Sequence, residues 1–382
     1  MREIFPPKII IFLNRFIMKL KIFGFIYLSR NQFVIIEIIL FSFFFLLTIF
    51  FFSWSVPEYV DDPMVLFHAK YLKYVTLALS FFVVVETQYY LNKFISKQLE
   101  INEKQRQQIE YQNGEIMKSI RYAGRIQEAI LPDNNKLPEN LDHFIFYKPK
   151  DIVSGDFYWF AEHYGKTVIV AGDCTGHGVP GAFMSVLGIS SLNDIINETE
   201  NELNSGEILN ILRDKVITSL KQGVEDSVSV SGIDLALIII DFKTNEIQFS
   251  GAKNPIFLIR DKKQFSNFEN SDYSVTDSET HVLFHFKPDK MHIGMYPIFQ
   301  PFKMQTFKAK KGDTIYLFSD GFVDQMGGNL GKKLMNKRFK NMLLNIQNKN
   351  MTEQKEIVEL YFNKWKGNLE QTDDVILFGI KI

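Results

Sequence analysis

The sequence predicts an α+β domain built as a layered sandwich, preceded by a helical connector and a membrane hairpin. From about Leu141 to Ile382, short β-rich runs alternate with turns and a few helical stretches, without regular βαβ alternation. A stretch before this domain, 92–131, contains no proline and is dense in Gln, Glu, Lys and Ile. Much of the apolar surplus of the chain lies in its first hundred residues. We therefore expect three successive parts with different surroundings.

Composition excludes several classes of protein. The chain has 382 residues and a net charge of -1, so we expect no nucleic-acid partner. It is 46% hydrophobic and contains 37 Phe, which excludes a mainly disordered chain. The one cysteine, Cys174, can form neither an intrachain disulfide nor a multi-cysteine zinc site.

Two apolar runs predict a transmembrane hairpin over residues 33–91. The first, 33–54, has Glu37 as its only charge and is long enough to cross a hydrocarbon core of roughly 30 Å as a helix. The second, 71–91, carries Lys73 and Glu86 near its ends, where long side chains reach the headgroups. A buried helix of a soluble domain would show a polar stripe, which the first run lacks.

The charges around the hairpin predict its orientation. The segment 1–32 has a net charge of +5, whereas the loop between the runs has a net charge of -2. By the positive-inside rule, both termini lie in the cytoplasm, so we expect a multi-pass protein of the cell (inner) membrane. The basic segment 1–32 is either an amphipathic helix in the inner leaflet or a basic cytoplasmic tail.

The connector, 92–131, has a heptad-like pattern that favours a parallel coiled-coil homodimer. Seven of its eleven seam positions are apolar. The seam consists of Ile95, Leu99, Asn102, Arg106, Ile109, Asn113, Ile116, Ile120, Ala123, Gln127 and Ile130. Because Arg106 and Gln127 interrupt it, a single amphipathic helix packed on its own domain remains the alternative.

The C-terminal domain, 136–382, is expected to begin after Pro132. Its candidate strands are Phe157–Ala161, Thr167–Ala171, Asp234–Asp241, Ile247–Ser250, Ile256–Arg260, Thr314–Phe318 and Asp374–Ile380. Its candidate helices are Pro180–Glu198, Glu207–Gly223 and Thr352–Lys366.

Aspartates stand at the ends of several of these strands. They are Asp156, Asp173, Asp320, Asp373 and Asp374. One such aspartate is usually a turn or cap residue. The adjacent Asp373 and Asp374 count as one site, and four sites together favour a shared role. Carboxylates are hard oxygen ligands that suit Mg²⁺ or Mn²⁺, and two such ions can activate a water and neutralise a phosphoryl group. The pattern therefore predicts metal-assisted phosphoester hydrolysis.

Competing chemistries fail on spacing. A cysteine-dependent phosphatase needs an arginine six residues after Cys174, where this chain has Pro180. The sequence Gly165-Lys166-Thr167 lacks the first glycine of a phosphate-binding loop. The histidine in the acidic constellation, His177, is either a turn residue or a catalytic acid.

Five segments together resemble the metal-dependent phosphatases of the protein phosphatase 2C (PP2C) type, in the branch related to stage II sporulation protein E. They are SIRYAGRIQEAILP (119–132), DIVSGDFYWF (151–160), GDCTGHGVPGAFMS (172–185), FSDGFVDQ (318–325) and TDDVILF (372–378). The resemblance covers about residue 119 to the end. It implies an αββα sandwich of two β-sheets flanked by helices, with a two-ion Mn²⁺ or Mg²⁺ centre at one edge.

The resemblance also implies a role for each acidic position. Asp173 would bridge both ions, and the carbonyl of Cys174 would complete one coordination sphere. Asp320 and Asp373 would hold the second ion, and Asp156 would bind metal directly or through water. Asp374 ranks below Asp373, since the family accepts Asp or Asn there. The arginine that clamps phosphate in eukaryotic relatives has no obvious counterpart in this chain.

The function implied is that of a membrane-anchored serine/threonine phosphatase with a cytoplasmic catalytic domain. Its substrates would be phosphoproteins, which in this family are frequently small anti-sigma-factor antagonists. The connector would act as a regulatory switch helix. The alternative is a non-catalytic membrane signalling scaffold that binds a phosphoprotein through a phosphatase-like domain.

Overall fold

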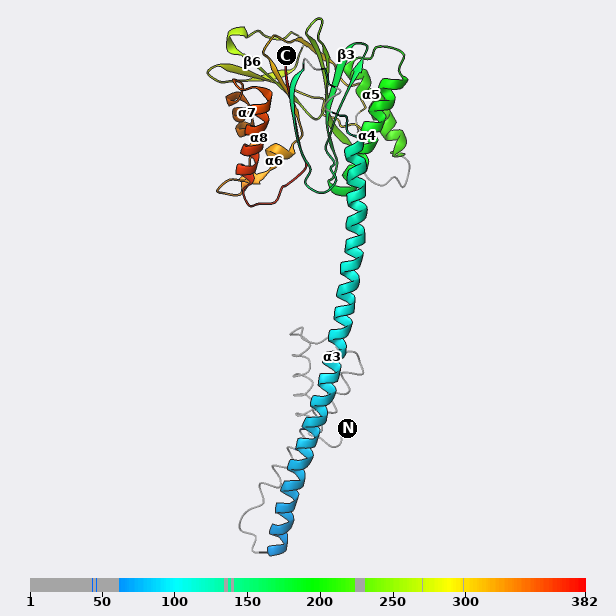
Figure 1. Ribbon diagram of the computed structural model, residues 1–382, viewed down its shortest axis with the longest axis vertical. Helices are drawn as coiled ribbons and strands as arrows, with labels where there is room; N and C mark the ends of the chain where they lie inside the picture. Colours follow the sequence, from blue (N-terminus) through cyan, green and yellow to red (C-terminus); the bar gives the residue numbers. More distant parts are fainter. Residues whose placement is uncertain are drawn as a thin grey trace. The chain divides into compact units, whose positions relative to one another are not determined.

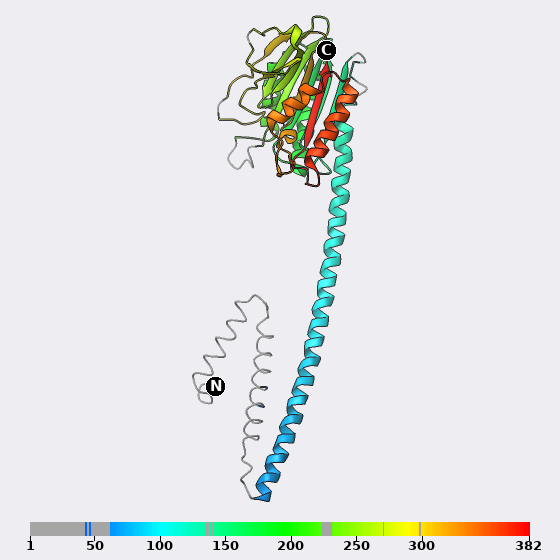
Figure 2. The same cartoon turned by 90° about the vertical axis from the view of Figure 1, so that its left-hand side faces the viewer.

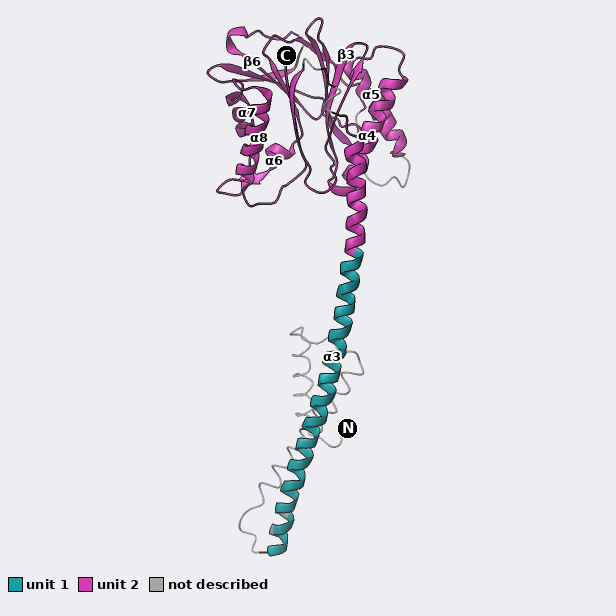
Figure 3. Ribbon diagram, viewed as in Figure 1, with its two compact units in different colours: residues 1–112 teal, residues 113–382 magenta. Residues whose placement is uncertain are grey.

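The computed structural model describes residues 43, 46, 62–133, 137–138, 141–223, 231–269, 271–297 and 299–382. The chain forms two compact units, Met1–Gln112 and Asn113–Ile382, and helix α3 (Pro63–Ile130) crosses the boundary between them (Figure 3). The first predicted membrane span, 33–54, lies outside the described residues apart from Phe43 and Leu46.

Helix α3 contains both the second predicted span and the connector. Pro63 suits the first helical position because it has no amide hydrogen to leave unpaired, and Asp62 Oδ1 accepts a hydrogen bond from the Met64 amide at 2.9 Å. An apolar window of α3 has a mean hydropathy of 1.2, and 6% of that window is buried. Among the described residues, one other helix is long and apolar enough to span a membrane, but half of its window is buried in the C-terminal unit.

Two antiparallel sheets form the centre of the C-terminal unit. The five-stranded sheet has the order β2-β3-β4-β5-β9, and the six-stranded sheet has the order β1-β13-β10-β6-β8-β7. The strands of the first sheet are β2 Phe157–His163, β3 Lys166–Cys174, β4 Ile233–Asp241, β5 Glu246–Ala252 and β9 Gln305–Lys308. Those of the second are β1 Asp142–Lys148, β6 Ile256–Asp261, β7 Tyr273–Asp277, β8 His281–Phe286, β10 Thr314–Phe318 and β13 Val375–Lys381. A short hairpin pairs β11 Met326–Gly327 with β12 Lys332–Lys333.

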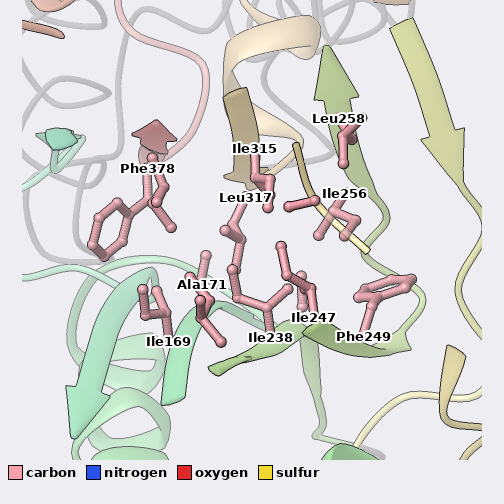
Figure 4. Close-up of a cluster of buried hydrophobic side chains, with 14 of the residues drawn as sticks. Ile169, Ala171, Ile238, Ile247, Phe249, Ile256, Leu258, Ile315, Leu317 and Phe378 are labelled. Atoms are coloured by element: carbon pink, nitrogen blue, oxygen red, sulfur yellow. The ribbon is translucent and has the colours of Figure 1, made fainter. Parts of the chain in front are cut away.

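The two sheets pack face to face through apolar side chains. In Figure 4, Ile169, Ile238 and Phe249 of one sheet face Ile256, Leu317 and Phe378 of the other. Alternate residues of each strand point to opposite faces, so Val168 and Val170 of β3 belong to a different apolar cluster from Ile169. Strands that are apolar on both faces must be covered on both, which is why helices flank the sandwich.

Helices cover both outer faces (Figures 1 and 2). Helices α4 (Gly178–Glu198) and α5 (Ser205–Ser219) pack on the five-stranded sheet through buried residues such as Ile189 and Leu209. Helices α7 (Met335–Asn345) and α8 (Met351–Lys366) cover the six-stranded sheet through Phe339 and Phe362. The remaining short helices are α6 (Gly321–Asp324) and a 3₁₀ turn at Lys262–Gln264. The predicted α+β, αββα sandwich is confirmed, as is a long helix before it.

All seven candidate strands correspond to strands of the structure, and each candidate helix corresponds to α4, α5 or α8. The predicted end of the second helix was wrong, because α5 ends at Ser219 and the chain then turns through Lys221 at a positive φ of 50°. Strands β1, β7, β8 and β9 and helix α7 were not predicted.

Candidate metal centre

The antiparallel registers gather the predicted aspartates at one end of each sheet. Asp156 immediately precedes β2 and Asp173 lies near the end of β3, and Phe157 pairs with Gly172. Asp320 follows β10 and Asp373 precedes β13, and Phe318 pairs with Leu377. The start of one strand therefore lies beside the end of its neighbour in both sheets.

The aspartates of the five-stranded sheet also interact electrostatically with those of the six-stranded sheet. Burial, together with the carboxylates of Asp374, Asp373 and Asp320, raises the pKa of Asp156 well above its ordinary value, although a hydrogen bond from Ser319 opposes the shift. Burial, together with the negative charges of Asp156 and Asp320, likewise raises the pKa of Asp173 well above its ordinary value. Carboxylates from both sheets thus lie close enough to repel each other.

Asp156 is held between the sheets. Its side chain is 3% exposed, and its Oδ2 accepts a hydrogen bond from the Ser319 hydroxyl at 2.5 Å. Ser319 Oγ also accepts a hydrogen bond from the Ile376 amide at 3.1 Å. The residue before Asp320 therefore ties Asp156 to the six-stranded sheet.

The loop after Asp173 packs closely on Gly155. A Cβ atom at Gly155 would lie 2.6 Å from the Gly176 carbonyl oxygen and 3.3 Å from that of Cys174, so only glycine fits there. The Cys174 carbonyl thus faces the backbone next to Asp156. Burial raises the pKa of the Cys174 thiol well above its ordinary value, which makes this side chain a poor nucleophile.

Asp320 is the most solvent-accessible of the predicted ligands. Its side chain is exposed at the start of α6, and partial loss of hydration, with Asp324 and Asp373 nearby, raises its pKa to about 6. Asp373 is half-buried, and its Oδ1 accepts a hydrogen bond from the Asp374 amide at 2.8 Å.

Asp374 has a different environment from its neighbour. It is 2% exposed, and its two oxygens accept hydrogen bonds from the Lys150 and Gly155 amides, each at 2.7 Å. Both oxygens are therefore used to fix the loop that leads into Asp156.

The end of α3 is hydrogen-bonded to the loop that leads into Asp156. Gln127 is 6% exposed, donates to the Ser154 carbonyl at 2.6 Å and to Ser185 Oγ at 2.7 Å, and accepts from the Ser154 amide at 2.9 Å. Gly124 lies one turn earlier, where a Cβ would be 2.9 Å from the Ile152 carbonyl oxygen. Gln127 interrupts the predicted seam because it serves the C-terminal unit.

Sequence reasoning missed one carboxylate beside the centre. Asp234 pairs directly with Asp173 across β3 and β4, and burial raises its pKa although Lys253 Nζ lies 3.4 Å away. Asp234 was assigned only to the start of a strand. The same signal, an aspartate where an apolar strand meets a glycine, could have identified it.

The chemistry of these donors suits hard divalent cations, because several carboxylates and a carbonyl share a partly desolvated edge with excess negative charge. Their arrangement is open. In the described part of the chain, no group of three or more His, Cys, Asp and Glu side chains is placed so that it could hold a metal ion. The strand registers and the Ser319–Asp156 hydrogen bond bring the carboxylates to one edge, whereas coordination would require their oxygens to converge further on an ion.

Comparisons with known proteins agree with this architecture. The family model of stage II sporulation protein E (SpoIIE) matches residues 163–382, a span that includes Asp173, Asp320 and Asp373 but not Asp156. No curated protein matched the chain.

Solved structures share the fold. The PP2C domain of SiaA from Pseudomonas aeruginosa is similar with 27% identity and a TM-score of 0.59, over 71% of this chain and 98% of that one. The PP2C domain of SpoIIE from Bacillus subtilis, with a regulatory fragment, has 17% identity and a TM-score of 0.47, over 64% and 63%. The catalytic domain of the phosphatase PstP in complex with two manganese ions has 13% identity and a TM-score of 0.43, over 63% and 97%. The chain therefore belongs to the stage II sporulation protein E family, and its C-terminal domain is a phosphoprotein phosphatase domain of the PP2C type.

Proposed function

We propose that this protein is a membrane-anchored, Mn²⁺- or Mg²⁺-dependent phosphatase that hydrolyses phosphoserine or phosphothreonine on a cytoplasmic signalling protein. The observation that carries the proposal is the gathering of carboxylates from both sheets at one edge of a PP2C sandwich, where they raise each other's pKa. A cluster of this kind is stable at neutral pH when cations compensate its charge.

Each proposed ligand has a distinct place. Asp173 would bridge two ions, with Asp156 and the Cys174 carbonyl on the side of the five-stranded sheet and Asp320 and Asp373 on the other. When bound, such ions supply an activated water and neutralise the phosphoryl group. The protein's own contribution is to keep the donors on rigid strand ends, with Ser319 orienting Asp156.

We propose the same division of the chain that the sequence suggests: a basic segment 1–32, a transmembrane hairpin 33–91, a connector 92–131 and a catalytic domain 136–382. The apolar, largely exposed window of α3 supports membrane insertion of the second span. Residues 1–32 would lie on the cytoplasmic side with the catalytic domain.

A homodimer through the connector is part of the proposal. Ile95, Leu99, Ile109 and Ile116 of the predicted seam are 45%, 63%, 56% and 55% exposed. Apolar residues repeated along an uncovered helix are expected to pair with a second copy. Because Gln127, in the last turn of α3, is hydrogen-bonded to the loop that leads into Asp156, we expect dimerisation to shift the position of this metal ligand.

Family membership supports a proposal for the substrate class. We propose a small phosphorylated regulatory protein, of the kind represented by anti-sigma-factor antagonists. The open arrangement of the carboxylates favours one alternative, a signalling scaffold that binds a phosphoprotein without hydrolysing it. Binding of divalent ions separates the two, because a scaffold should lack tight sites.

The test uses the full chain in detergent micelles, with para-nitrophenyl phosphate and a phosphoserine peptide as substrates. Wild type should release phosphate only when Mn²⁺ or Mg²⁺ is present, and Asp173→Ala and Asp320→Ala should each lose about a hundredfold or more. Asp214→Asn is the matched control, since Asp214 is a highly exposed carboxylate on α5. Wild-type activity no higher than that of the two variants would refute the phosphatase function.

A further inference from the structure

A short polar chain links the two loops that carry Asp156 and Asp173. Lys150 Nζ lies 3.2 Å from His177 Nε2, and His177 Nδ1 lies 3.2 Å from Asp151 Oδ2. Lys150 and Asp151 precede Asp156 on one loop, and His177 follows Asp173 on the other.

The partners of His177 determine which of its nitrogens carries the proton. An ammonium group can only donate, so Nε2 must accept from Lys150. An ionised carboxylate can only accept, so Nδ1 must donate to Asp151. In this tautomer the ring links the Asp151 carboxylate to the Lys150 ammonium. It also leaves Nε2 without a proton to give to a leaving group in this arrangement.

The backbone next to these side chains is fixed to the metal centre. The Lys150 amide donates to Asp374 Oδ1, and the Gly155 amide donates to Asp374 Oδ2. Gly178 follows His177 at a φ of 66°, and a Cβ there would lie 3.5 Å from Asp151 Oδ2. The Lys150 backbone therefore lies beside Asp374, and its ammonium is held by His177 on the loop that follows Asp173.

Lys150 is not neutralised there. Although carboxylates crowd the centre, Lys150 Nζ forms no ion pair within the part of the chain that the structure describes, where its side-chain partner is His177. Two of its three N–H groups thus remain available. His177 and Asp151 are each about half exposed, at 52% and 50%, so a ligand can reach this point from solvent.

We propose that Lys150 binds an oxygen of the substrate's phosphoryl group, and that His177 and Asp151 are positioning residues that aim its ammonium. The ligand class is a phosphomonoester dianion or free phosphate, which a lysine binds as a point charge. Lys150 would supply the cationic contact for which the sequence offers no arginine. This proposal rests on the phosphatase function proposed above.

Inorganic phosphate tests the contact without turnover. Phosphate is titrated calorimetrically into the Mg²⁺-loaded full chain in detergent, and KM and kcat for para-nitrophenyl phosphate are measured on the same samples. Lys150→Met should weaken phosphate binding by about tenfold to a hundredfold, the range expected for loss of a charge-assisted hydrogen bond, and should raise KM in parallel. Lys150→Arg should restore most of the affinity.

Lys148→Met is the matched control. Lys148 lies two residues earlier, but its Nζ contacts Asn363 at 2.8 Å and the Phe362 ring rather than His177. This variant should bind phosphate as wild type does. His177→Ala should weaken phosphate binding less than Lys150→Met does, because the Lys150 ammonium remains but loses the hydrogen bond that fixes its position.

Three outcomes would overturn the proposal. If Lys150→Met binds phosphate normally in an enzyme that hydrolyses para-nitrophenyl phosphate, Lys150 only ties the two loops together, and the phosphatase function stands. If Lys150→Met instead loses Mg²⁺ binding while Lys148→Met keeps it, Lys150 maintains the metal loop and does not contact phosphate. If wild type shows neither metal-dependent hydrolysis nor phosphate binding, both proposals fail.

Discussion

Asp373 and Asp374 are adjacent in sequence, but their surroundings assign them different tasks. Asp374 uses both oxygens to accept hydrogen bonds from backbone amides, whereas Asp373 uses Oδ1 to accept one from the Asp374 amide. A carboxylate whose oxygens are already hydrogen-bonded inside the protein is a structural tether. One with an unused oxygen near other carboxylates suits a metal ligand.

Asp374→Ala should therefore reduce stability more than Asp373→Ala does. Removing the Asp374 carboxylate leaves the Lys150 and Gly155 amides without acceptors, which should lower the free energy of unfolding by about 2–4 kcal/mol. Asp373→Ala should change it by less than about 1 kcal/mol while weakening Mn²⁺ binding. Urea denaturation without metal, followed by metal titration, measures both effects. Equal destabilisation by the two substitutions would contradict this division of roles.

At the scale of elements, the end of α3 is built into the catalytic unit through Gln127. Gln127→Leu keeps a side chain of similar size but leaves the Ser154 amide without its acceptor, and the Ser154 carbonyl then keeps only the hydrogen bond from Ser185 Oγ. We expect a loss of about 2–4 kcal/mol in unfolding free energy and weaker Mn²⁺ binding, because Ser154 lies two residues before Asp156. Denaturation and metal titration are again the measurements.

Gln107→Leu is the control for this substitution, since Gln107 lies on the same helix and its side chain donates a hydrogen bond to the exposed side chain of Glu103. It should leave stability and metal affinity unchanged. Equal behaviour of the Gln107 and Gln127 variants would show that α3 is not coupled to the metal loop.

The contact between β8 and α7 predicts a pH effect. Burial, with Lys340 and Lys287 nearby, lowers the pKa of His285 to about 4 from an ordinary value of 6.5. Between these values the unfolded chain binds a proton that the folded chain does not, so this group's contribution to stability is full above pH 6.5 and is lost as pH falls toward 4.

His285→Gln should remove that part of the pH dependence, about 1–2 kcal/mol after allowance for solvent screening. The measurement is the difference between the unfolding free energies of wild type and variant at pH 7.5 and pH 4.5. Wild type should lose more stability relative to the variant at the lower pH. A difference that does not change with pH would show that folding does not lower the pKa of His285.

At the scale of the whole molecule, the exposed seam of α3 predicts association of two chains. Ile116 is a seam residue and is 55% exposed. The variant Ile116→Cys should therefore form an intermolecular disulfide in oxidised membranes. Lys118→Cys lies off the seam and should crosslink far less. The native Cys174 is buried and should not interfere. Monomers alone from Ile116→Cys, at every protein concentration, would refute the dimer.

Sequence patterns predicted the parts of the fold that depend on local signals. Apolar runs identified β3, β4 and β10, because such strands are buried on both faces. Strand β7 was missed because its YSVTD sequence lies at a sheet edge, with two of its residues half-buried and none fully buried. Helix α7 was missed because six of its eleven residues are Asn, Lys or Arg, and it buries only a narrow apolar face.

The candidate site was predictable as a set of residues and not as a geometry. Asp156, Asp173, Asp320 and Asp373 could be selected because each adjoins an apolar strand. The contact of Ser319 with Asp156 and that of Asp374 with the Lys150 amide join positions far apart in the chain. Such contacts depend on how the two sheets stack, which no local pattern encodes. Gln127 was read as a defect in a seam for the same reason.

The central claim is that the acidic edge of the sandwich binds a pair of divalent ions. Calorimetric titration of Mn²⁺ into the full chain in detergent tests it most directly, since the described carboxylates must converge further to coordinate metal. We predict two ions per chain in wild type, loss of both in Asp173→Asn, and retention of one in Asp320→Asn. Fewer than one ion per wild-type chain, or unchanged binding in Asp173→Asn, would contradict the claim.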